Sequence, residues 1–210
     1  ELSIRPGEGQ EALFGQARER MKRAGLNTRS LHFRLFKRSV DARRRDDIRL
    51  VCTVLVEADA PLSERECSRA GLKPLSDGMP AMRTGTEPMK KPPLVVGMGP
   101  AGLFAALLLA QNGYRPVIID RGDAVSERVE RVGRFRIGGG LDAESNIQFG
   151  AGGAGTFSDG KLVTRIHDPR CRFVLDTFHR FGAPDEILTL AKPHIGTDVL
   201  RTVVARMLAE

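Results

Sequence analysis

Three glycines and one carboxylate in the middle of the chain have the types and spacing to hold a phosphorylated ligand. The glycines are Gly97, Gly99 and Gly102, and the carboxylate is Asp120, at the end of the apolar run Val117–Ile119. Gly97 permits a tight turn, Gly99 lets the backbone approach a pyrophosphate, and Gly102 lets a helix pack closely on a sheet. Asp120 follows Gly102 by 18 residues, close to the roughly 20 typical of an acid that accepts from a ribose hydroxyl.

The segments around these residues predict the strand, turn, helix and strand that such a motif needs. Leu94–Val96 is a short apolar run, and Ala101–Asn112 is rich in alanine and leucine and is followed by Gly113. A glycine at that point is typical of a helix C-terminus. The free N–H groups and the positive end of that helix would then face the phosphates. The order is that of the first unit of a dinucleotide-binding fold.

A second glycine-dense passage, Gly138–Gly160, follows a charged helical stretch at Val125–Val132. Each glycine costs backbone entropy on ordering, so the passage is neither a regular helix nor a central strand. It favours a place where the backbone passes close to a ligand. We expect Arg128 and Arg131 to be exposed on the preceding helix.

Three segments extend the argument beyond the glycines. Ser145–Leu162, with the sequence SNIQFGAGGAGTFSDGKL, resembles a largely uncharacterised bacterial family of FAD-dependent dehydrogenases, which are distant relatives of the flavoproteins with two dinucleotide-binding domains. Phe36–Arg43 (FKRSVDAR) is similar to a motif in the small N-terminal domain of that family, and Lys192–Asp198 (KPHIGTD) to a later one. The resemblance implies that the flavin and substrate domains continue beyond this chain.

The resemblance also implies a set of cofactor contacts. Gly97, Gly99 and Gly102 would cradle the FAD pyrophosphate, and the loop from Gly152 to Lys161 would wrap the pyrophosphate and ribityl region. Lys161 would lie near the flavin, where a cation favours the reduced, anionic ring. The full set of expected cofactor-binding residues is Gly97, Gly99, Pro100, Ala101, Gly102, Asp120, Arg121, Arg128, Gly152, Gly153, Gly155, Thr156, Ser158 and Lys161.

Thr156 and Ser158 are expected to donate hydroxyl hydrogen bonds to that cofactor. Asp120 stands where many flavoproteins have Glu, and Ala151 where the family commonly has Glu. No residue is assigned a catalytic role. His194 is a candidate acid or base, but a hydrogen-bonded structural histidine is favoured, and the claims of His167 and His179 are weaker.

Composition excludes several classes of protein. Three scattered cysteines predict neither a disulfide framework nor a metal site, and no apolar run reaches the ~20 residues of a membrane span. A cytoplasmic protein is expected. The net charge of +7 comes mostly from residues 1–93, which carry 19 Lys and Arg against 13 Asp and Glu. A basic surface suits acidic partners, but few aromatic residues accompany it, which disfavours nucleic acid.

The expected fold class is α/β, an incomplete Rossmann-like FAD-binding domain preceded by a small α+β domain. The α+β domain would span residues 1–60, a connector 61–93, and the first part of the FAD-binding domain 94–210. Period-two and period-3.6 patterns predict the elements. The expected helices are 11–24, 63–70, 125–132, 173–181 and 197–208, the last capped by Thr197 or Asp198, and the expected strands or extended segments are 31–40, 48–56 and 187–190.

The function expected from this pattern is that of an FAD-dependent oxidoreductase, a dehydrogenase of unassigned substrate that passes hydride or electrons through the flavin. NAD(P)H is one candidate donor. A second reading gives the Rossmann unit NAD(P) as its ligand, since Arg121 beside Asp120 suits a 2′-phosphate. A third reading is a flavin-containing protein that binds or modifies RNA through the basic N-terminal domain.

Overall fold

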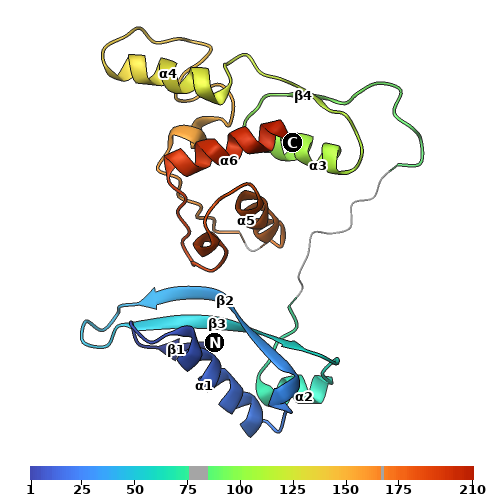
Figure 1. Cartoon of the computed structure of the whole chain (residues 1–210), viewed down its shortest axis with the longest axis vertical. Helices are drawn as coiled ribbons and strands as arrows, with labels where there is room; N and C mark the ends of the chain where they lie inside the picture. Colours follow the sequence, from blue (N-terminus) through green and yellow to red (C-terminus); the bar gives the residue numbers. More distant parts are fainter. Residues whose placement is uncertain (76–84, 167) are drawn as a thin grey trace. The chain divides into compact units, whose positions relative to one another are not determined.

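The computed structural model describes residues 1–75, 85–166 and 168–210. The chain is mixed α/β and divides into two compact units (Figure 1). The N-terminal unit comprises Glu1–Gly78, His167–Arg172 and Asp185–Pro193, and the C-terminal unit comprises Met79–Ile166, Phe173–Pro184 and His194–Glu210. The domain limits expected from the sequence remain a prediction.

The N-terminal unit is a three-stranded antiparallel sheet with the order β1-β3-β2, with helix α1 packed on it. Strands β2 and β3 form the expected hairpin, in which Leu31 faces Ala58 and Asp41 faces Arg49, with a bulge after Leu35. Its elements are β1 (Leu2–Ile4), α1 (Gln10–Arg23), η1 (Thr28–Ser30), β2 (Leu31–Asp41), β3 (Arg49–Ala58), α2 (Glu64–Ala70) and η3 (Asp185–Leu188).

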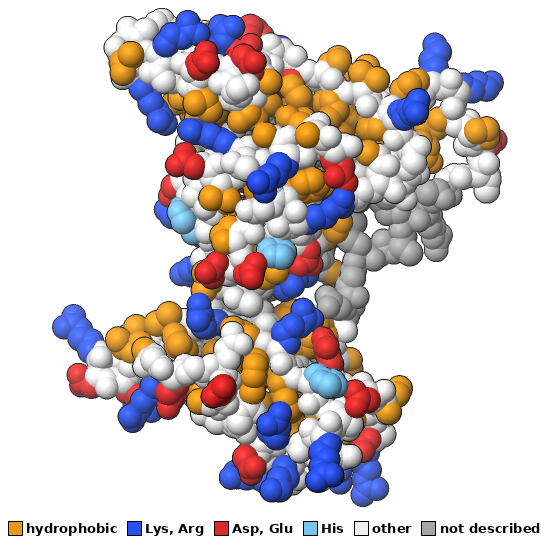
Figure 2. Space-filling view, in the orientation of Figure 1, with side chains coloured by type: hydrophobic (Ala, Val, Ile, Leu, Met, Phe, Trp, Pro, Cys, Tyr) orange, Lys and Arg blue, Asp and Glu red, His pale blue; other side chains and the backbone are white. Residues whose placement is uncertain are grey.

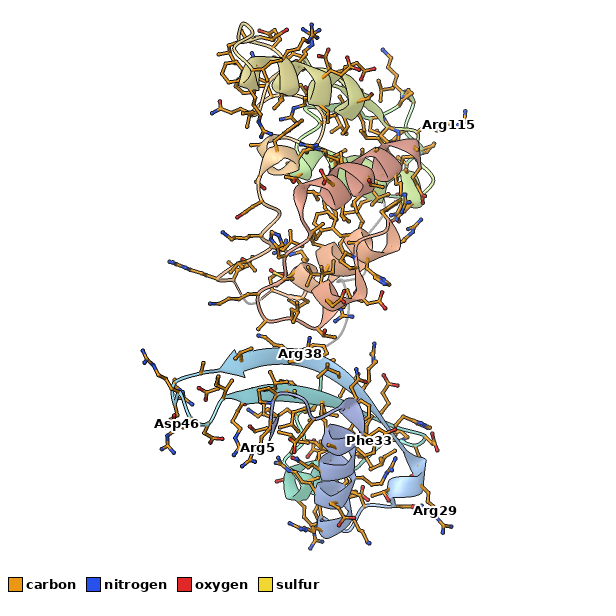
Figure 3. All side chains as sticks on the ribbon, turned by 60° about the vertical axis from the view of Figure 1, so that its left-hand side comes forward. Arg5, Arg29, Phe33, Arg38, Asp46 and Arg115 are labelled. Atoms are coloured by element: carbon orange, nitrogen blue, oxygen red, sulfur yellow. The ribbon has the colours of Figure 1, made fainter. Side chains whose placement is uncertain are left out.

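The core of this unit forms where the apolar face of α1 meets the sheet. Leu13 of α1 packs with Ile4 and Cys52, and Met21 packs with Leu31. The rings of Phe14 and Phe33 stack with their centroids 6.5 Å apart, and Figure 3 shows Phe33 on β2 beside α1, with the labelled charged residues Arg29 and Asp46 at the ends of the hairpin. The 3.6-residue and two-residue patterns thus meet in one core.

A later segment of the chain extends this sheet at its open edge. The Arg38 N–H donates to the Thr189 carbonyl at 2.6 Å, and the Ala191 N–H donates to the Arg38 carbonyl at 2.9 Å. The guanidinium of Arg172 lies 5.9 Å from the centre of the Phe36 ring. The expectation of an extended segment at 187–190 was wrong for most of its length, because Asp185–Leu188 forms a 3-10 turn. Only the end of the segment pairs with β2.

The C-terminal unit is built on one strand–helix–strand unit. Strands β4 and β5 pair in parallel, with Leu94 opposite Val117 and Val96 opposite Ile119, and the helix between them packs on both. The elements of the unit are β4 (Leu94–Val96), α3 (Pro100–Gln111), β5 (Val117–Ile119), α4 (Val125–Arg136), η2 (Ala154–Phe157), α5 (Arg170–Arg180, which enters this unit at Phe173) and α6 (Thr197–Ala209).

Three helices differ from expectation by more than one residue or in their cap. Helix α5 begins at Arg170, three residues before the expected start at Phe173. Helix α4 continues four residues past Val132, to Arg136, because Phe135 and Arg136 are helix formers as acceptable as those before them. Helix α6 is capped by Gly196, with no side-chain hydrogen bond, so Thr197 and Asp198 lie inside the helix and the prediction of either as the cap was wrong.

Several expectations concern what the chain lacks. Among residues 1–75, 85–166 and 168–210, no group of His, Cys, Asp and Glu side chains is arranged to hold a metal ion. None of the helices that the structure describes combines the length and the apolar character needed to cross a bilayer. His167 and part of the expected 61–93 connector lie outside the described residues.

One face of the small parallel sheet is exposed in the part of the chain that the structure describes. Figure 2 shows apolar side chains gathered at the surface around β4. The exposed fraction reaches 75% at Val96, and the neighbouring positions Leu94, Val117 and Ile119 on the same face are also exposed. The alternate residues Val95 and Ile118 are only partly exposed.

Candidate functional site

The first glycine turn joins β4 to α3 with the geometry that the sequence predicted. Gly97 has a φ of +98°, a left-handed conformation that favours glycine, and its N–H donates to the Ile119 carbonyl at 2.7 Å. A Cβ at Gly102 would overlap the Gly97 carbonyl oxygen, so only glycine lets α3 come this close. Gly99 is the N-cap of α3, and Pro100 is its first helical residue.

Gly99 differs from Gly102 in what surrounds it. A Cβ at Gly99 would meet no atom within 4 Å, and its φ of −71° and ψ of 178° are open to any residue. Neither packing nor backbone conformation therefore requires glycine there. A ligand that occupies the space beside Gly99 would explain the glycine. Such a ligand would be an anion, because the first N–H groups of a helix have no intrahelical partner and attract anions.

Asp120 fastens this turn to the end of β5. One carboxylate oxygen, Oδ2, accepts from the Met98 N–H at 2.7 Å, and the other, Oδ1, accepts from the Gly122 N–H at 2.8 Å. The carboxylate therefore has a structural task that sequence reasoning missed. Each oxygen keeps a second lone pair, so the expected ribose contact stays a prediction.

The second glycine passage folds directly onto the first turn. The Gly152 N–H donates to the Met98 carbonyl at 2.7 Å. A Cβ at Gly153 would lie 3.1 Å from Cδ of Pro100 and 3.3 Å from Cα of Gly99. Gly152 and Gly153 have φ angles of +84° and +66°. The two glycine segments thus form one cradle, defined here as Gly97–Pro100 together with Gly150–Gly153.

A neighbouring glycine pair, which sequence reasoning missed, closes the back of the cradle. A Cβ at Gly122 would lie 2.5 Å from Cα of Gly150, and the Ala151 N–H donates to the Asp123 carbonyl at 3.0 Å. Asp142 and Asn146 shape the loop between Gly122 and Gly150. The Oδ1 atom of each accepts hydrogen bonds from the backbone N–H groups two and three residues further along the chain. Asx residues at these offsets are a turn signal that the sequence did contain.

Arg128 overturns an expectation. It is not exposed on α4 but fully buried, with 0% of its surface accessible. Its Nε donates to the Asn146 carbonyl at 2.8 Å, and Nη2 donates to the Ile147 carbonyl at 2.9 Å. Its Nη1 donates to the carbonyls of Ala151 and Gly153 at 2.7 and 2.8 Å. We predicted exposure because Arg128 is a charged residue on a highly charged helix. In the structure its side chain lies on the face of α4 that packs against the glycine passage.

Arg131 is partly exposed and forms ion pairs with Asp123 and Asp142. Arg121 lies at the edge of the same loop, with its guanidinium 4.3 Å from the centre of the Phe149 ring and its Nε 3.4 Å from Oε2 of Glu144. Its partners in this structure are therefore within the protein.

The hydroxyl groups of the loop are also used internally. Thr156 is fully buried, and its hydroxyl donates to the Ala151 carbonyl at 3.5 Å. The expectation that this hydroxyl donates to the cofactor stays a prediction. Ser158 is exposed, and its hydroxyl donates to the Gly155 carbonyl at 2.8 Å. Gly155 has open space where a Cβ would lie.

An apolar cavity of about 490 Å³ opens beside the cradle in the C-terminal unit. The start of α3 and the 152–162 loop form one side, and α5 and α6 form the other. Its lining residues are Pro100, Ala101, Leu103, Phe104, Gly152, Gly155, Thr156, Ser158, Gly160, Lys161, Leu162, Val174, Phe178, Leu200, Val204 and Met207. Ligand pockets of this size and apolar character are typical of small-molecule sites.

Lys161 supplies the one cationic side chain among these lining residues. Its Nζ lies 2.7 Å from Oδ2 of Asp159. The hydrogen bond between the two raises the pKa of Lys161 and lowers the pKa of Asp159, and the charge of His194 lowers the Asp159 pKa further. His194 pairs with Lys161 as an isolated β-bridge and is exposed. The three titratable residues therefore lie together, a grouping that the sequence separation of 33 residues concealed.

The segment that builds the first side of the cradle matches a known family. Residues 90–133, from before β4 into α4, match the family described as FAD binding domain. This match supports FAD as the cofactor of the chain.

A curated relative covers more of the chain. The chain is 44% identical over 182 residues to a protein from Clostridium beijerinckii that bears the name "Uncharacterized protein". The match covers 84% of this chain and 33% of the relative. The chain therefore spans about a third of the length of the curated relative it matches.

Proposed function

We propose that this chain forms part of an FAD-dependent oxidoreductase, a dehydrogenase of the bacterial family that the sequence resembles. The observation that carries the proposal is the open space at Gly99, at the start of α3, between two glycine segments that touch each other. FAD supplies hydride or electron transfer when bound. The protein supplies free N–H groups for the diphosphate, close backbone for its approach, and an apolar cavity next to it.

The cavity supports a site for the rest of the cofactor. Its lining is mostly apolar, and Ser158 and Lys161 add polar groups at the 152–162 loop. A cation at Lys161 would favour a reduced, anionic flavin, but its ion pair with Asp159 reduces that effect. The Rossmann-like character of the β4–α3–β5 unit belongs to the same proposal, since the described residues form only two strands of such a sheet.

The alternative ligands have weaker support. A 2′-phosphate of NADP would have to compete with Glu144 for Arg121. The basic N-terminal unit has Phe33 packed against α1 and under the guanidinium of Arg18, so this ring is not free to stack on a base. Cytoplasmic location and NAD(P)H as the donor remain proposals.

The test compares cofactor content in the purified full-length protein and in Gly99→Val. Gly99→Val should lose bound flavin while the melting temperature of the apoprotein stays within a few degrees, because its side chain enters open space. The cofactor is released by heat and identified by chromatography against FAD, FMN and NAD(P).

Gly133→Val is the matched control, since a Cβ at Gly133 also meets nothing within 4 Å but lies on α4 away from the cradle. It should retain the wild-type flavin content. Finding only FMN or NAD(P) in the wild type would refute the proposal, and so would normal flavin content in Gly99→Val.

A further inference from the structure

The proposed function leaves the buried Arg128 without a role, although it is the largest fully buried side chain among the described residues. A buried cation is costly unless its donors are satisfied. Arg128 meets this requirement with backbone carbonyls, which lie 18 to 25 residues further along the chain. The ring of Phe157 lies 4.6 Å from its guanidinium carbon and covers one face.

The contacts of Arg128 converge on one side of the cradle. The acceptors at Ala151 and Gly153 flank Gly152, whose N–H bonds the Met98 carbonyl of the first turn. The aliphatic part of Arg128 also packs against Gly150, because a Cβ at Gly150 would lie 2.8 Å from Cδ of Arg128. One side chain thereby binds carbonyls at both ends of the segment, at residues 146 and 147 and at residues 151 and 153.

The charge of Arg128 also matters, since none of these hydrogen-bond acceptors is a carboxylate. Burial lowers its pKa and the charge of Asp120 opposes that shift, but a guanidinium stays protonated in proteins. A fixed cation behind a thin layer of backbone attracts an anion on the other side of that layer more strongly than it would in water. The Gly150–Gly153 segment is such a layer.

We propose that Arg128 is a positioning residue for the cofactor diphosphate. It acts through the Gly150–Gly153 segment, which it holds against the first glycine turn, and it adds a buried positive charge behind that segment. It does not touch the cofactor. The inference rests on the proposed function, because it assumes that a diphosphate enters the cradle.

The experiment uses the full-length protein freed of cofactor, with Arg128→Lys and Arg128→Met. Lysine keeps the charge, but its single ammonium group cannot donate to all four carbonyls as the planar guanidinium does. Methionine removes both the charge and the hydrogen-bond donors. We expect the Kd for FAD to rise about tenfold in Arg128→Lys and about a hundredfold in Arg128→Met. Arg134→Met, which removes an exposed arginine from the same helix, should change the Kd less than about twofold.

A second readout separates positioning from mere stability. ADP and AMP are titrated against each variant, and the Kd for AMP is divided by the Kd for ADP, because the two nucleotides differ by one phosphate. In the wild type ADP should bind more tightly than AMP. In Arg128→Met the ratio should fall toward one, whereas a merely structural loss would weaken both nucleotides equally and leave the ratio unchanged.

The outcomes are distinct from a failure of the proposed function. Wild-type protein that binds no FAD refutes the proposed function. Wild-type protein that binds FAD, together with an unchanged ratio of the AMP Kd to the ADP Kd in both Arg128 variants, overturns the role of Arg128 alone. If neither variant is soluble, Gly153→Ala tests the same segment, since its Cβ would press on Pro100 and Gly99. A wild-type ratio in Gly153→Ala would also overturn the inference.

Discussion

At the residue scale, the cradle shows that glycines in one motif serve different purposes. Gly102 is required by packing, because its Cβ would overlap the Gly97 carbonyl, whereas Gly99 borders open space. The same contrast applies to polar groups. Arg128 and Thr156 satisfy their donors inside the protein, while the start of α3 keeps its N–H groups available. A site can therefore combine residues that build it and residues that leave room in it.

Asp120 offers a prediction at this scale. Asp120→Asn retains one acceptor oxygen but places an NH2 group against either the Met98 or the Gly122 N–H. We expect the free energy of unfolding to fall by about 1–3 kcal/mol, because one hydrogen bond to a charged acceptor is lost. Urea denaturation measures the change, and a flavin titration measures the accompanying loss of FAD affinity.

Glu130→Gln serves as the matched control, because Glu130 is an exposed acid on α4 and should tolerate the change. An Asp120→Asn protein with wild-type stability but lost FAD affinity would show that the carboxylate acts on the ribose alone. Wild-type stability together with wild-type FAD affinity would show that the hydrogen bonds from Met98 and Gly122 to Asp120 contribute nothing measurable.

At the scale of elements, the sequence patterns did not predict that a later segment of the chain extends the N-terminal sheet. Residues 189–191 pair with Arg38 on the open edge of β2, through two backbone hydrogen bonds. Edge strands present unpaired N–H and C=O groups, and covering them is a recurrent solution. The segment Lys192–Asp198, noted for its resemblance to a family motif, follows directly after this pairing.

Ala191→Pro tests this pairing. Proline has no N–H, so the bond from Ala191 to the Arg38 carbonyl is lost, and only the bond from the Arg38 N–H to the Thr189 carbonyl still holds the segment to β2. We expect the free energy of unfolding to fall by about 0.5–1.5 kcal/mol. Hydrogen–deuterium exchange of the Arg38 amide should also accelerate.

Ala191→Val keeps the N–H and favours a strand, and should leave exchange at Arg38 unchanged. A proline variant with both the stability and the Arg38 exchange rate of the wild type would mean that the segment does not pair with β2 in solution.

At the scale of the whole molecule, the uncovered face of the β4–β5 sheet is the most consequential feature. Four exposed apolar residues lie in register on that face, at Leu94, Val96, Val117 and Ile119. Contiguous apolar surface on a small sheet with unpaired edges promotes association. The chain spans about a third of the length of its curated relative, so this prediction concerns the 210-residue chain alone.

We expect the 210-residue chain, expressed by itself, to self-associate at micromolar concentration through this face. Replacing Val96 and Ile119 with threonine should lower the associated fraction, because threonine keeps the β-branched shape while removing apolar surface. Sedimentation velocity measures the distribution of species.

The control replaces Val163 and Ile166 with threonine, since both are exposed apolar residues of a loop outside the sheet. Association that falls equally in both double variants would assign it to general hydrophobicity and not to the sheet face.

The amino-acid sequence by itself determined the β4–α3–β5 unit, its glycine turn and the N-terminal hairpin with its helix. These depend on short-range rules: period-two and period-3.6 patterns, and glycines where a turn or a close helix requires them. The resemblance of Ser145–Leu162 likewise predicted FAD, in agreement with the family match over residues 90–133.

Only the tertiary structure decided the burial of Arg128, the double use of Asp120 and the pairing of residues 189–191. A charged helix residue is exposed by default, and nothing local to Arg128 says that carbonyls 18 to 25 residues away will turn toward it. Asp185–Leu188 likewise folds into a 3-10 turn despite an apolar pattern that suited a strand. Backbone carbonyls carry no sequence signature, so the contacts that shape this cradle become visible only when the chain is folded.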